Sequence, residues 1–69
     1  MTTTKRLVYM ANQIAANLKT DADPVGAVAA HMTLFWDPRM KRLILEHGPD
    51  GLTPIAASAV ERLARAPNG

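Results

Sequence analysis

Apolar residues recur at helical spacing in four segments of the chain, and turn-forming residues separate these segments. The spacing predicts helices over residues 4–19, 24–36, 38–47 and 54–65. No segment predicts a strand. We therefore expect an all-α fold, a small bundle of three to four short helices in a single small domain over residues 1–69, with a frayed end at residues 66–69.

The first predicted helix has an uncharged outer surface. Its apolar stripe consists of Leu7, Met10, Ala11, Ile14 and Leu18. The opposite side holds Tyr9, Asn12, Gln13 and Ala16, and no charged residue occurs between Leu7 and Leu18. A solvent-exposed helix surface normally carries charged residues. This surface therefore indicates contact with another protein.

The second predicted helix is apolar nearly all round. One side carries Val25, Val28, Ala29, Met32, Phe35 and Trp36, and the other carries Ala27, Ala30 and Leu34. Such a helix is usually buried. A chain of 69 residues buries only about 60% of the surface that its unfolded form exposes. Part of the burial of this helix is therefore expected to come from another protein.

Three predicted helices begin with a capping residue followed by proline, at Asp23-Pro24, Asp37-Pro38 and Thr53-Pro54. The capping side chain accepts a hydrogen bond from a first-turn N–H, and proline is favoured at the first helical position because an N–H there has no helical partner. A residue before proline is also kept out of the α conformation. Asp37-Pro38 therefore predicts a sharp corner between the second and third helices, and Gly48 is the expected C-cap of the third.

The third and fourth predicted helices are amphipathic. Their expected inward residues are Met40, Leu43, Ile44 and His47 on the third helix, and Ala56, Ala59, Val60 and Leu63 on the fourth. The expected solvent-facing residues of the fourth helix are Ser58, Glu61, Arg62 and Arg65.

The two adjacent aromatic residues at the predicted corner are expected to have different roles. Large aromatic side chains dominate small cores, so Phe35 is predicted to lie in the core. Tryptophan is rarely fully buried, and Trp, Arg and Met are enriched at protein interfaces. Because Arg39 and Met40 follow one helical turn after Trp36, we predict that Trp36 anchors a partner interface.

Charge and cysteine content exclude several classes of protein. The net charge is +2 with a pI near 9.5, but only Arg39, Lys41 and Arg42 cluster, which is short for a nucleic-acid footprint. The chain has no cysteine, which excludes disulfides and thiolate metal sites and fits a reducing cytoplasm. No secretory signal is expected, and the longest uncharged stretch, residues 24–36, is shorter than the ~20 residues that span a bilayer.

Candidate catalytic and metal-binding residues are few. His31 and His47 lie on different predicted helices, and nothing in the sequence brings the carboxylates of Asp37 and Glu46 together. Ser58 has no histidine or aspartate at helical spacing to activate it. We therefore expect no catalytic site, no metal site and no bound cofactor in this chain.

Four segments together resemble a known family. They are LVYMANQIA (Leu7 to Ala15), H-x-x-x-F-W-D-P-R-M (His31 to Met40), G-L-x-P (Gly51 to Pro54) and A-V-x-R-L (Ala59 to Leu63). The combination resembles the delta subunit of NAD-dependent molybdenum formate dehydrogenases. M-A-N-Q-I and F-W-x-P-R-M are the specific parts. The family usually has Thr where this chain has Asp37, and Asp keeps the N-cap chemistry.

The resemblance implies a non-catalytic accessory subunit of a cytoplasmic bacterial enzyme. It implies docking on a large catalytic alpha subunit that carries molybdopterin guanine dinucleotide and iron–sulfur clusters, while beta and gamma subunits carry flavin and further clusters and reduce NAD. The implied role is assembly, cofactor insertion or stability of the alpha subunit. The partner-interface residues predicted from the two specific segments are Tyr9, Asn12, Gln13, Trp36, Pro38, Arg39 and Met40.

Two other hypotheses remain open from the sequence. The first is a small basic helical domain that binds nucleic acid through Arg39, Lys41 and Arg42. The second is self-association of the isolated chain, in which the apolar second helix pairs with its own copy. The resemblance favours a protein partner, with no nucleic acid and no membrane.

Overall fold

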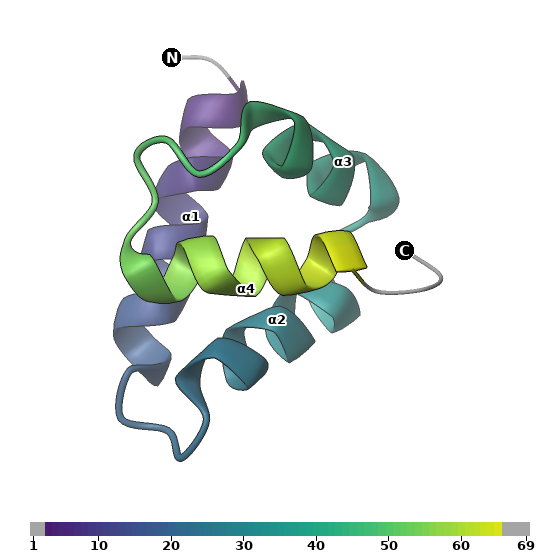
Figure 1. Cartoon of the computed structure of the whole chain (residues 1–69). Helices are drawn as coiled ribbons and strands as arrows, with labels where there is room; N and C mark the ends of the chain where they lie inside the picture. The colour runs from purple at the N-terminus through teal and green to yellow at the C-terminus, as the bar shows by residue number, and fades with distance from the viewer. Residues whose placement is uncertain (1–2, 66–69) are drawn as a thin grey trace.

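The computed structural model describes residues 3–65, which form four helices and no strand (Figure 1). The helices are α1 (Thr3–Leu18), α2 (Pro24–Phe35), α3 (Pro38–His47) and α4 (Pro54–Arg65). The predicted all-α fold is confirmed, and each predicted helix boundary agrees with the structure to within one residue. The predicted frayed end at residues 66–69 lies outside the described residues.

All three predicted cap-and-proline starts form as expected. The capping bonds run from Gly26 N to Asp23 Oδ1 (3.1 Å), from Met40 N to Asp37 Oδ1 (2.8 Å) and from Ala56 N to Thr53 Oγ1 (3.4 Å). Each satisfies one of the first-turn N–H groups that a helix leaves without a partner, which typically stabilises a helix by about 1 kcal/mol. The start points of α2, α3 and α4 are therefore encoded locally.

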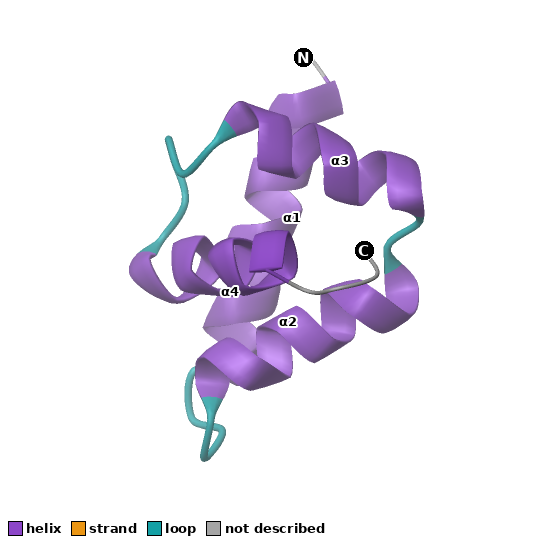
Figure 2. Cartoon of the chain, turned by 45° about the vertical axis from the view of Figure 1, so that its right-hand side comes forward, coloured by secondary structure: helices purple, strands orange, loops and turns teal. Residues whose placement is uncertain are grey.

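The four helices pack around one another so that α4 crosses in front of α1, between α3 and α2 (Figures 1 and 2). The most extensive packing is between α4 and α2, and α1 contacts all three other helices. In contrast, α2 and α3 contact each other least, although they are neighbours in the chain. The corner between α2 and α3 therefore separates the two helices, and the space between them must be filled by side chains.

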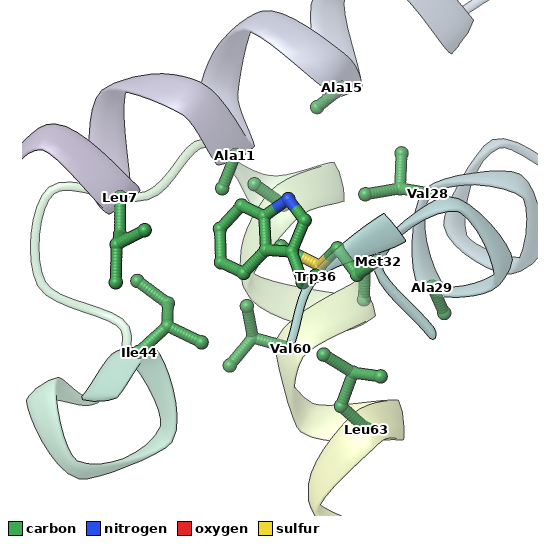
Figure 3. Close-up of a cluster of buried hydrophobic side chains, with 12 residues drawn as sticks. Leu7, Ala11, Ala15, Val28, Ala29, Met32, Trp36, Ile44, Val60 and Leu63 are labelled. Atoms are coloured by element: carbon green, nitrogen blue, oxygen red, sulfur yellow. The ribbon is translucent and has the colours of Figure 1, made fainter. Parts of the chain in front are cut away.

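Trp36 fills this space. The Trp36 ring lies among side chains from all four helices, including Ala11, Met32, Ile44 and Val60 (Figure 3). Trp36 is only 4% exposed. The buried hydrophobic residues of the described chain are Leu7, Ala11, Ala15, Val28, Ala29, Met32, Trp36, Ile44, Ala56, Ala59, Val60 and Leu63. Five of these twelve residues are alanines, which have small side chains. Trp36 has the largest side chain of the twelve and therefore supplies much of the apolar volume of the core.

The predicted roles of the two adjacent aromatics were therefore wrong, because they are reversed. Phe35 is 71% exposed and Trp36 is buried. The helical wheel placed both rings on one face of α2, but α2 ends at Phe35 and the backbone at Trp36 is extended (φ −88°, ψ 135°). This change of backbone direction turns the Trp36 ring inward and leaves the Phe35 ring on the surface at the last helical position.

Most other predicted inward residues are confirmed, with two exceptions. All four inward residues predicted for α4 are buried. On α1, Leu7 and Ala11 are buried, but Met10 is 36% exposed, and Ala15 takes part in the core instead. On α3, Ile44 is buried, whereas His47 is exposed, and its Nε2 lies 2.9 Å from the carbonyl oxygen of Asp50 in the following loop.

Two hydrogen bonds of the Asn12 side chain connect α1 to the loop between α3 and α4. Its Nδ2 donates to the carbonyl oxygen of Gly51 (2.9 Å), and its Oδ1 accepts from the N–H of Thr53 (2.9 Å). The loop starts at Gly48, the predicted C-cap, where a φ of 85° favours glycine. Both the oxygen and the nitrogen of the Asn12 side chain therefore form hydrogen bonds within the chain, which gives Asn12 a structural role; its predicted contact with a partner stays a prediction.

Replacing Trp36 should destabilise the chain far more than replacing Phe35. Trp36→Ala removes the largest core side chain and is expected to lower the free energy of unfolding by about 3–5 kcal/mol. Phe35→Ala changes an exposed position and is expected to cost less than about 0.5 kcal/mol. Urea unfolding followed by circular dichroism measures both, and equal losses would contradict the packing described for the corner.

Replacing Asn12 should loosen the loop between α3 and α4. Asn12→Ala leaves Gly51 O and Thr53 N without their partner, for an expected loss of about 1–2 kcal/mol in the free energy of unfolding. Gln13→Ala is the matched control, since Gln13 Nε2 donates only locally, to the Tyr9 hydroxyl on the same exposed helix surface (2.7 Å). We expect the control to change the urea midpoint little, and similar shifts for both variants would argue against the role of Asn12.

Candidate partner interface

The end of α2 presents two adjacent apolar side chains to solvent. Leu34 is 76% exposed and Phe35 is 71% exposed, which makes them the two most exposed large hydrophobic residues of the described chain. The ring of His31, one turn earlier, lies against Phe35 with its centroid 4.7 Å away and the planes tilted by 41°. We call Leu34 and Phe35 the apolar pair. Single exposed apolar residues are common, but here two consecutive residues are exposed and the His31 ring packs on one of them, so the last turn of α2 exposes more apolar side chain than an isolated residue would.

Lys41 lies beside the apolar pair. Its Nζ donates to the carbonyl oxygen of Thr33, in the last turn of α2, at 3.1 Å. That carbonyl belongs to the peptide that joins Thr33 to Leu34. The ammonium group of Lys41 is therefore held next to the backbone that carries the apolar pair, where the negative end of the α2 dipole also attracts a cation.

The remaining predicted residues of the corner occupy the start of α3. Pro38 and Arg39 are exposed in its first turn, and Met40 is partly buried against the core. The structure therefore brings Pro38 and Arg39 to the surface near the apolar pair, while Met40 and Trp36 belong mainly or wholly to the core. Trp36, which was predicted to contact a partner, is buried. Phe35, which was predicted to lie in the core, is the aromatic residue exposed at the corner.

The predicted outer surface of α1 is partly retained. Tyr9 is 63% exposed and its hydroxyl accepts from Gln13 Nε2, so these two residues form a polar, uncharged surface one turn long. Asn12, on the same helix, is bonded to the loop between α3 and α4. A partner contact through Tyr9 and Gln13 stays a prediction.

The basic residues proposed for nucleic-acid binding do not act as three equivalent free cations. Lys41 is half-buried and bonded to Thr33, whereas Arg39 and Arg42 are exposed. Within residues 3–65, neither arginine forms an ion pair; the ion pairs there are Arg62 with Asp23 (3.7 Å) and Arg65 with Glu61 (3.1 Å). Two exposed arginines form a smaller electrostatic footprint than nucleic-acid binding usually requires.

Within residues 3–65, no group of three or more His, Cys, Asp or Glu could hold a metal ion. Ser58 and Glu61 line an open depression of about 330 Å³ between α4 and the end of α3, and no histidine lines it. None of the helices in this part of the chain is long and apolar enough to cross a membrane.

Comparison with known proteins identifies a family for this chain. A model of the family described as NADH-dependant formate dehydrogenase delta subunit FdsD matches residues 6–60. No curated protein and no solved structure matches the chain. The matched residues include α2, α3, the corner between them and the loop that Asn12 fastens. The chain therefore belongs to the family of NADH-dependent formate dehydrogenase delta subunits.

Proposed function

We propose that this chain is a non-catalytic subunit that docks on the large catalytic subunit of a molybdenum formate dehydrogenase through the apolar pair at the end of α2. The observation that carries the proposal is the exposure of Leu34 and Phe35, at 76% and 71%, in a chain that buries its only tryptophan. Membership of the delta subunit family supports a formate dehydrogenase as the complex in which docking occurs.

The energetics favour this surface for docking. Burying an exposed Leu or Phe side chain contributes about 1.5–3 kcal/mol each. Leu34 and Phe35 do not make this contribution in the isolated chain, because they lie outside its core. A stable interface covers about 800 Å² on each partner, which is more than two side chains provide. The accessible surface of the chain is 4653 Å², so an interface of that size would occupy roughly a sixth of it.

The additional area is expected to come from neighbouring residues. Pro38 and Arg39 continue the surface beyond the apolar pair along the chain, and we propose that they complete the main contact. Tyr9 and Gln13 on α1 are proposed as a second contact. Tyr9 has a large exposed ring with a polar end, a side chain that is common at interfaces.

The chemistry of the complex is proposed to lie in other subunits. Iron–sulfur clusters are held by cysteine thiolates, and this chain has none. We propose that molybdopterin guanine dinucleotide, iron–sulfur clusters and flavin are bound by the partner subunits. The role of this chain is then to support assembly, cofactor insertion or stability of the catalytic subunit in the cytoplasm.

Co-purification tests the docking surface. Phe35→Ala in a tagged chain, expressed together with the other subunits, should weaken binding to the catalytic subunit by about 2 kcal/mol, or roughly thirtyfold in Kd. Phe35→Leu keeps an apolar side chain and should retain most of the binding. The measurement is the amount of large subunit recovered, followed by titration of the purified partners.

A control separates docking from folding. Replacing the exposed ion pair of α4 by Glu61→Ala and Arg65→Ala changes surface residues outside the proposed contacts and should leave recovery unchanged. If Phe35→Ala binds like the wild type while its melting temperature is also unchanged, the apolar pair is not the docking surface.

A further inference from the structure

We infer that the surface of the catalytic subunit that receives the apolar pair is an apolar pocket with carboxylates at its rim, facing Lys41, Arg39 and Arg42 of this chain. The inference rests on the proposed docking function and adds the chemistry of the partner surface. It follows from how charge is distributed in the chain and from how Lys41 is positioned.

The corner between α2 and α3 carries a net positive charge. Residues 31–45 contain three bases, Arg39, Lys41 and Arg42, and one acid, Asp37, which gives +2. The other five bases and five acids of the chain cancel. The carboxylate of Asp37 is already engaged, since its Oδ1 caps α3 by accepting from Met40 N. The corner is therefore one of two positive regions of the chain; the other is residues 5–19, where Lys5, Arg6 and Lys19 have no acidic residue among them.

A hydrogen bond to the end of α2 positions the ammonium group of Lys41. Its bond to Thr33 O uses one of the three ammonium donors and leaves the others available. Because Thr33 immediately precedes Leu34, the ammonium is bonded to the last turn of α2, the turn that carries the apolar pair. A partner that covers Leu34 and Phe35 would partly remove Lys41 from water, and a carboxylate of the partner at that point would compensate the cost.

Arg39 and Arg42 extend the positive region along α3. They lie three residues apart on the exposed side of the helix, and neither has an acidic partner within residues 3–65. Exposed charges at the rim of an interface chiefly speed association and select the partner, while the buried apolar contacts slow dissociation. The corner thus combines exposed apolar side chains on the last turn of α2 with exposed cations on α3, which we call the rim.

A second copy of the chain fits this surface poorly. Pairing through a two-fold axis at the apolar pair would bring each basic corner against the other, and juxtaposed like charges are costly. A nucleic acid would satisfy the two arginines but would offer no apolar cavity to Leu34. An acidic, apolar protein surface satisfies both parts of the corner.

The test compares two charge reversals of equal size. Arg39→Glu with Arg42→Glu changes the rim, and Lys19→Glu with Arg62→Glu makes the same change at exposed loop and α4 positions outside both proposed contacts. Binding of each chain to immobilised catalytic subunit, purified from cells that lack this chain, is followed by surface plasmon resonance. Circular dichroism checks that each variant is folded.

We expect the rim reversal to lower the association rate constant about tenfold or more at ~50 mM salt, with little change in the dissociation rate constant. Because salt screens these charges, the difference should shrink toward ~0.5 M salt. The control reversal should change the association rate less than about threefold. Phe35→Ala, in contrast, should mainly raise the dissociation rate constant.

Other outcomes distinguish the inference from the proposed function. If Phe35→Ala weakens binding but the rim reversal behaves like the control, the acidic rim is wrong and docking through the apolar pair stands. If neither the wild type nor any variant binds the catalytic subunit, the proposed function is wrong and the inference falls with it. Mobility shift of a DNA or RNA probe by the wild type in place of subunit binding, or a dimer in sedimentation that Phe35→Ala dissolves, would also overturn the inference.

Discussion

Burial of the Trp36 ring is the interaction on which the rest of this structure depends. The chain has one tryptophan, and twelve residues of its described part form a buried hydrophobic core in which five are alanines. Alanines let helices approach closely, but they supply little apolar area. A single indole between α2 and α3 touches side chains of all four helices and takes the place of several medium-sized residues (Figure 3). The packing of the four helices therefore depends strongly on the side chain at position 36.

The backbone at the corner makes this burial possible. Proline at position 38 keeps Asp37 out of the α conformation, and Asp37 has a ψ of 166° and caps the next helix. The chain leaves α2 in an extended conformation at Trp36, which directs its ring inward. The same geometry leaves Leu34 and Phe35 exposed on the last turn of α2. One short stretch of sequence thus supplies both the centre of the core and the surface that we propose meets a partner.

Phe35 and Trp36 are neighbours in the chain but differ in burial, so their substitutions are expected to have different effects. A surface residue can be replaced with little effect on folding, whereas the core residue beside it cannot. With docking through the apolar pair as proposed, binding and stability are expected to respond to mutation at two different, adjacent positions. The cationic residues of α3 add a further separable property, because charges at a rim affect association and partner choice more than they affect folding or residence time.

The sequence by itself determined the local features of this protein. Helix starts at Asp23, Asp37 and Thr53, the end at Gly48, and the inward face of α4 could all be predicted, because caps, prolines and helical periodicity act over a few residues. Only the tertiary structure decided which of Phe35 and Trp36 enters the core, since periodicity assumes that a helix continues and α2 stops between them. It also decided the role of Asn12, whose partners Gly51 and Thr53 lie 39 and 41 residues away along the chain. No local pattern reports a hydrogen bond between such distant positions.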